Sequence, residues 1–140
     1  MKKLSIAIFI LFFFFSNVAF AKKEKPLLIL TSKNPAITKA SMDGVIAEKY
    51  FKKNSKIYFI IYNPNGFKSD YIKYQIVKQD DLAHVGGFTR ARNVTKRVKD
   101  KNFFSDYFTL GIEGKYFIQI FDIENLQHWL AIESFRVVND

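Results

Sequence analysis

Alternating and apolar stretches separated by turn residues run through most of the chain after residue 25. Residues 56–62 (KIYFIIY) form a nearly continuous apolar run, which is typical of a central strand buried on both faces. Residues 71–78 (YIKYQIVK) alternate instead, with Ile72, Tyr74 and Ile76 on one face and Lys73 and Gln75 on the other. This pattern predicts a half-buried strand with one polar face.

Six further segments are also typical of strands: residues 26–32, 45–51, 88–95, 103–110, 115–122 and 129–138. Residues 45–51 (VIAEKYF) would also suit one or two helical turns, but the β-branched and aromatic residues at their ends favour a strand. The sequence Asn63-Pro64-Asn65-Gly66 predicts a turn after residues 56–62. Seven or eight short strands, without an amphipathic helix of ten residues, predict an all-β fold, either a β-sandwich or a barrel.

The first 21 residues have a different pattern. Lys2 and Lys3 precede an apolar run over residues 4–15, and Ala19-Phe20-Ala21 forms a small-x-small cleavage site, which together predict a signal peptide over residues 1–21. An uncleaved anchor is the alternative, because residues 4–21 approach the length of a bilayer span. We expect cleavage, which leaves one domain over residues 22–140 in the periplasm or outside a bacterial cell, with no transmembrane span.

The charge of the chain is concentrated in one segment. The full chain carries a formal charge of +9, and removal of Lys2 and Lys3 with the signal peptide would leave +7. Residues 90–101 hold six basic side chains against the single acid Asp100, so this segment carries +5. Its basic residues are Arg90, Arg92, Lys96, Arg97, Lys99 and Lys101.

This basic segment is the candidate binding site of the sequence. Arg90 and Arg92 would share one face of a regular strand. Phe88 precedes the segment and Phe103-Phe104 follows it, and basic residues beside exposed aromatic rings can bind single-stranded nucleic acid by charge and stacking. The alternative is structural, because positive side chains on an edge strand prevent its pairing with another chain.

The last third of the chain carries an ordered set of residues. Leu110 is followed by Gly-Lys-Tyr-Phe-Ile-Gln-Ile at 114–120, by Asp122 and Asn125, and by Phe-Arg-Val at 135–137. This order resembles the final strands of bacterial immunoglobulin-like domains, a superfamily that includes fibronectin type III-like modules. The resemblance covers residues 110–138. It implies an immunoglobulin-like antiparallel β-sandwich of seven to eight strands, with Tyr116 as a tyrosine corner whose hydroxyl bonds to upstream backbone.

Signatures of catalysis and of metal binding are sparse. His84 and His128 are the only histidines, and neither has a metal-ligand spacing. Asp80-Asp81 and residues 122–125 could supply oxygens to Ca²⁺, but acids are common in turns because they bond their own backbone. The chain has no cysteine, which excludes thiol catalysis, disulfides and an acylated lipobox. We therefore predict that the chain is not an enzyme and has no catalytic residue, no metal site and no cofactor.

Two functions follow from these observations. The first is an exported, non-catalytic immunoglobulin-like domain that binds or supports a protein or polymer of the cell envelope, or a secreted partner. The alternative is a polyanion-binding protein that uses residues 90–101 against nucleic acid, lipopolysaccharide or a glycan. Its affinity would fall steeply as salt rises.

Overall fold

The computed structural model describes residues 23–35, 44–79 and 87–139. Within these ranges the chain forms eight β-strands, so the prediction of an all-β fold is confirmed. The strands are β1 (Leu27–Thr31), β2 (Tyr50–Lys52), β3 (Lys56–Tyr62), β4 (Tyr71–Gln79), β5 (Phe88–Arg97), β6 (Phe103–Thr109), β7 (Gly114–Asp122) and β8 (Asn125–Val138).

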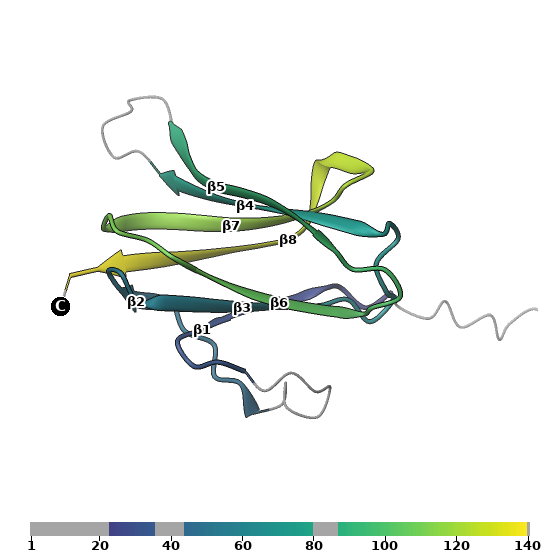
Figure 1. The fold of residues 1–140 in the computed structure, drawn as a ribbon, viewed down its shortest axis with the longest axis horizontal. Coiled ribbons are helices and arrows are strands. Elements are labelled where there is room, and N and C mark those ends of the chain that lie inside the picture. The colour runs from purple at the N-terminus through teal and green to yellow at the C-terminus, as the bar shows by residue number, and fades with distance from the viewer. Residues whose placement is uncertain (1–22, 36–43, 80–86, 140) are drawn as a thin grey trace, which may run out of the picture.

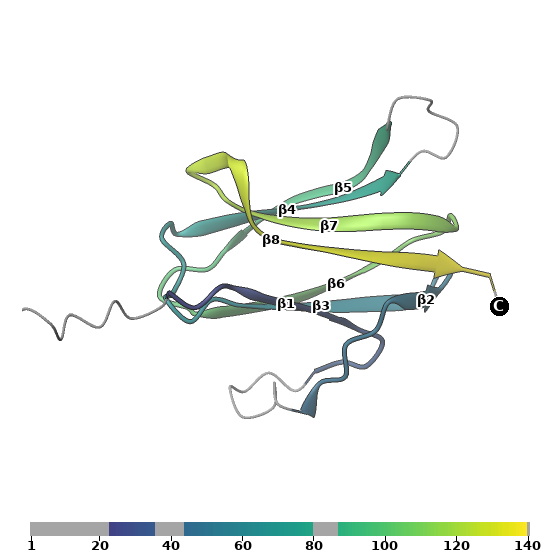
Figure 2. The ribbon, with the colours of Figure 1, turned by 180° about the vertical axis from the view of Figure 1, so that it is seen from behind.

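The strands form two sheets that pack as a β-sandwich (Figure 1). One sheet has three strands in the order β1-β3-β6, and the other has five in the order β2-β8-β7-β4-β5. All neighbouring strands are antiparallel except β2, which pairs parallel with β8. In Figures 1 and 2, β4, β5, β7 and β8 occupy the upper layer and β1, β3 and β6 the lower one. Both β5 and β6 are edge strands, one in each sheet.

The core lies between the two sheets and follows the apolar pattern of the strands. Ile72, Tyr74 and Ile76 of β4 are fully buried there, as the alternation of that segment predicts. Residues 59–61 of β3 are also fully buried, which agrees with a central strand covered on both faces. The Phe59 ring lies 4.9 Å from the Tyr74 ring, edge to face, so that aromatic packing joins the centres of the two sheets.

The segment at 45–51 forms much less strand than predicted. Its chain leaves one sheet and joins the other: the Glu48 amide donates to the Leu30 carbonyl of β1, and the Lys49 carbonyl accepts from the Arg136 amide of β8. Regular pairing with either sheet cannot continue across this change, so β2 has only three residues. The final strand is longer than predicted, because β8 begins at Asn125 in a hairpin with β7.

The start of β7 contains a backbone conformation that favours glycine. Gly114 has a φ of +145°, a value that side chains with a Cβ rarely adopt. Two residues later, the buried Tyr116 hydroxyl donates a hydrogen bond to the Ile112 carbonyl at 2.7 Å. The Tyr116 ring stacks on Phe135 of β8 with 5.6 Å between centroids. Gly114 and Tyr116 thus determine the backbone path at the start of β7.

Some predicted features lie outside the described residues. These are the signal peptide at 1–21, His84 and Asp80-Asp81. His128 is an exposed residue of β8. Asp122 is buried and accepts hydrogen bonds from the Ser69 hydroxyl and from the Glu124 amide at 3.0 Å, as an acid that organises a turn does. In the described ranges no helix is long and apolar enough to cross a membrane.

Candidate anion-binding face

The structure divides the predicted basic segment into three parts. Arg90 and Arg97 lie on the outer face of the five-stranded sheet, opposite Val77 and Tyr71 of β4. Arg92 and Lys96 lie opposite buried residues of β4 and therefore on the side that faces the other sheet. Lys99 and Lys101 follow β5 in its connection to β6.

A β-bulge separates Arg90 from Arg92. In the β4–β5 register, Ile76 pairs with Arg92 and Val77 pairs with Arg90, which leaves Ala91 without a partner in the ladder. Ile76 and Val77 are consecutive residues of β4 and point to opposite faces, so their partners do as well. The prediction that Arg90 and Arg92 share a face is therefore wrong, because the extra residue of the bulge reverses the alternation.

The inward basic residues belong to a polar cluster between the sheets. The fully buried Tyr74 donates a hydrogen bond from its hydroxyl to Asp106 of β6 at 3.0 Å. Lys96 Nζ lies 3.4 Å from Asp106 Oδ2, and the positive charge of the exposed Arg92 also acts on the Tyr74 hydroxyl. Burial and the nearby Asp106 charge raise the pKa of Tyr74 to about 12. Arg92 and Lys96 thus close the side of the sandwich where the edge strands β5 and β6 face each other.

The connection from β5 to β6 carries mixed charge. Lys99 Nζ lies 3.7 Å from Asp70 Oδ2, and both side chains are about half exposed. Arg97, Lys99 and Lys101 line a shallow depression of about 340 Å³ together with Asp100. Asp70 and Asp100 lower the net positive charge of this end of the molecule. The basic segment is therefore not one continuous positive surface.

The outer face of the five-stranded sheet gathers cations from all five strands. Pairing and alternation place six basic side chains on it: Lys52, Lys73, Arg90, Arg97, Lys115 and Arg136. Among the described strands, no outward position of this sheet is Asp or Glu. Of these cations, the sequence predicted only Arg90 and Arg97 as site residues. For Lys115 a signal was present in the alternation of 115–121, where Lys115, Phe117, Gln119 and Phe121 all occupy one face.

Aromatic rings lie between these cations. The outward aromatic residues are Tyr50, Tyr71, Phe88, Phe117, Phe121 and Trp129. Phe88 and Trp129 are more than half exposed. The Phe88 ring lies edge to face on Phe117 with 5.8 Å between centroids, and Lys115 Nζ lies 5.2 Å from the centre of the Phe117 ring. In Figures 1 and 2, the β7–β8 turn and one end of β4 and β5 rise on either side of this face.

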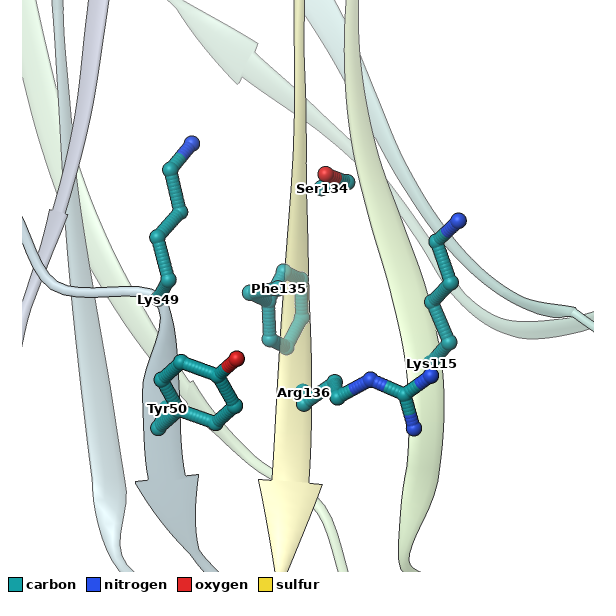
Figure 3. Close-up of a pocket in the computed structure, with 6 residues that line it drawn as sticks. All are labelled: Lys49, Tyr50, Lys115, Ser134, Phe135 and Arg136. Carbon is teal, nitrogen blue, oxygen red and sulfur yellow. The ribbon is translucent and has the colours of Figure 1, made fainter.

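A depression of about 230 Å³ lies at one corner of the face, across β2, β8 and β7 (Figure 3). It is lined by Lys49, Tyr50, Lys115, Ser134, Phe135 and Arg136. Figure 3 shows Tyr50 beside Arg136, whose guanidinium extends towards Lys115. Lys115 and Arg136 are directly opposite each other in the β7–β8 register. Lys49 forms an ion pair with Glu133, so it is the one cation of the depression with a carboxylate partner among the described residues.

Comparisons with known proteins find similarity in fold. No family model matches the chain, and no curated protein matches its sequence. Its structure is similar to that of the soluble domain of PmoD from Methylocystis sp., with a TM-score of 0.50 and 14% sequence identity over 81% of this chain and 90% of that one. At this identity the likeness shows a shared fold.

Two superoxide reductase (neelaredoxin) structures from Ignicoccus hospitalis, one of them of a variant, are also similar, each with a TM-score of 0.45. Their identities are 8% and 9%, over 82% and 83% of this chain and 81% and 82% of theirs. The prediction that the chain is not an enzyme is contradicted by these two structures, because an enzyme has a similar fold. They assign no activity to this chain, and the described residues contain no group of three His, Asp or Glu that could hold a metal ion.

Proposed function

We propose that the chain is an exported domain of the immunoglobulin-like type that binds a polyanion through the outer face of its five-stranded sheet. The observation that carries the proposal is the composition of this face: six cations from five strands, six aromatic rings, and no acid at an outward position of the described strands. Such a surface attracts anionic groups by its field and offers rings on which sugars or bases can stack.

The sheet order supports the immunoglobulin-like assignment. A three-stranded sheet β1-β3-β6 faces β8-β7-β4-β5, with the short β2 parallel to the last strand. The Tyr116 hydroxyl bonds to backbone four residues upstream, as the hydroxyl of a tyrosine corner does. In such sandwiches the second sheet has one face on the core and one free, so a binding surface can occupy the free face without changing the core.

The binding face differs from the basic segment of the sequence. Arg90 and Arg97 belong to both, whereas Arg92 and Lys96 have partners between the sheets. Because the face is positively charged, we propose that the partner, in the envelope or outside the cell, is an anionic polymer such as a nucleic acid, a lipopolysaccharide or an acidic glycan. Charge neutralisation at the six outward cations is the proposed mechanism.

Salt dependence tests this function. For a labelled single-stranded DNA, six contacts predict that log affinity falls with log salt with a slope of about −4.2, measured by fluorescence anisotropy. The double variant Arg90→Gln/Arg97→Gln should bind more weakly and with a slope smaller in magnitude by about 1.4. A heparin-like sulfated glycan is tested in the same way, because binding of either polymer supports the proposal.

The matched control removes two cations from the other side of the sandwich. Lys56 begins β3, and Lys33 is an exposed residue just after β1. The double variant Lys33→Gln/Lys56→Gln should keep the affinity and the salt slope of the parent. The proposal fails if neither polymer binds, if binding is indifferent to salt, or if the control loses as much affinity as the Arg90→Gln/Arg97→Gln variant.

A further inference from the structure

We propose that the depression formed around Tyr50, Lys115 and Arg136 is a specific site for a phosphate or sulfate ester group. The inference rests on the proposed function and adds to it a defined anchor on the binding face. It concerns residues outside the basic segment of the sequence, contributed by β2, β7 and β8.

The register of the sheet creates an uncompensated pair of like charges at this place. Lys115 and Arg136 are directly opposite each other, and like charges in opposite cross-strand positions destabilise a sheet. Neither side chain has an ion pair with a carboxylate in the described ranges, and the nearby Glu133 is engaged by Lys49. An anion bound between the two cations would remove their repulsion.

The donors match the chemistry of an oxyanion ester. The planar Arg136 guanidinium can donate two parallel hydrogen bonds, and the Lys115 ammonium adds a point charge beside it. The Tyr50 and Ser134 hydroxyls line the same depression and can donate to further oxygens. A tetrahedral phosphate or sulfate presents three such oxygens while its fourth carries the rest of the ligand. The depression, at about 230 Å³, has room for the ester oxygen and part of the attached residue.

The floor and wall of the site are fixed by the fold. Backbone hydrogen bonds from Arg136 to Lys49 at 2.8 Å and from Lys53 to Val138 at 2.9 Å hold β2 against β8. The buried Phe135 lies beneath, stacked on Tyr116 and edge to face with Phe51. Because the strands are held in place without a ligand, less ordering entropy is lost on binding.

An aromatic platform adjoins the site on the same strand. Lys115 Nζ contacts the Phe117 ring, and the exposed Phe88 ring meets that ring edge to face. Residues two apart on a strand are separated by about 7 Å along it. A ring attached to the bound ester would therefore lie over Phe117 and Phe88, which places charge recognition and stacking next to each other.

The site is tested with inorganic anions and the folded chain. In ¹H–¹⁵N NMR titrations, phosphate and sulfate are each compared with chloride at equal ionic strength. We expect saturable shifts at Tyr50, Lys115, Ser134 and Arg136. Binding of both anions indicates a general oxyanion site, and binding of one alone identifies the ester as phosphate or sulfate. Shifts equal to those in chloride, or spread evenly over all cations of the face, would overturn the inference.

Two variants separate this inference from the proposed function. Lys115→Gln/Arg136→Gln should weaken binding of the small anion at least tenfold, whereas Arg90→Gln/Arg97→Gln removes the same charge from the same face and should leave it unchanged. If polymers bind but the two variants respond equally to phosphate and sulfate, the ester site is wrong and the proposed function stands. If neither polymer nor small anion binds, both are wrong.

Discussion

At the scale of single residues, Tyr74 determines the role of the two cations beside it. Its hydroxyl is buried between the sheets and donates to Asp106, which also attracts Lys96. The alternation of residues 71–78 predicts that Tyr74 is buried, and the structure agrees. The partner Asp106 was not predictable, because it lies 32 residues away on an edge strand of the other sheet.

Replacement of Tyr74 by Phe tests this cluster. The variant loses the hydrogen bond to a partly buried carboxylate, so the free energy of unfolding should fall by about 2 kcal/mol in urea denaturation. It should also change the alkaline limit of stability. The folded-state pKa of Tyr74 is about 12, whereas tyrosine titrates near 10 in an unfolded chain. The unfolded chain therefore loses the proton first, and stability present below pH 10 is lost as pH rises towards 12.

The control for this prediction is the exposed Tyr107. Tyr107→Phe should keep the stability profile of the parent, because the Tyr107 side chain is 46% exposed. Tyr74→Phe should decline less steeply than the parent, and the remaining slope is expected from Tyr116, whose pKa is also raised by burial. Identical alkaline declines in parent and Tyr74→Phe would contradict the assignment.

At the scale of elements, strand register decides which charges meet. The β4–β5 bulge turns Arg90 outwards and Arg92 inwards, and the β7–β8 register sets Lys115 against Arg136. Alternation within one strand predicts two faces but cannot show an extra residue, since a bulge depends on the partner strand. For the same reason 45–51 was predicted as one strand, although its chain moves between sheets at Glu48 and Lys49.

Because Lys115 and Arg136 lie opposite each other, we expect a substitution that removes one of these charges to raise stability and to weaken anion binding. Arg136→Gln removes the repulsion with Lys115, so the free energy of unfolding should rise by about 0.5 kcal/mol at low salt, and the gain should shrink as salt screens the charges. The same variant should bind phosphate or sulfate more weakly. Urea denaturation at two salt concentrations measures the first effect. Lys56→Gln, which loses a contact with the Tyr107 ring instead, should not gain stability.

At the scale of the whole molecule, the binding face exists only because two hairpins lie side by side. β4 and β5 bring three of its cations, β7 and β8 bring two, and Lys52 of β2 is the sixth. Between them the sheet order places β7 next to β4, although about 35 residues separate these strands in sequence. On the outward positions of the other sheet's described strands Lys56 is the one basic residue, so positive charge concentrates on one side of the sandwich, whereas outward aromatic rings lie on both sides.

Export is the prediction for the chain as a whole. Expressed in a bacterium, it should appear outside the cytoplasm with a new N-terminus at Lys22, seen by intact-mass spectrometry as loss of residues 1–21. Ala19→Phe removes a small residue of the cleavage site and should leave the signal attached. A full-length chain that stays in the cytoplasm would contradict the prediction, and a full-length chain in the membrane fraction would support the uncleaved anchor.

The sequence by itself determined the all-β class, the position of most strands and the inward face of β4, because period-two alternation is a local property of the chain. It could not determine which cations share a surface. That depends on strand order, on one bulged residue and on a register between separate strands, all of which form only when the sheets assemble. Tertiary structure therefore turned Arg92 and Lys96 towards the inside of the sandwich and joined Arg90 and Arg97 with Lys73, Lys115 and Arg136 on one face.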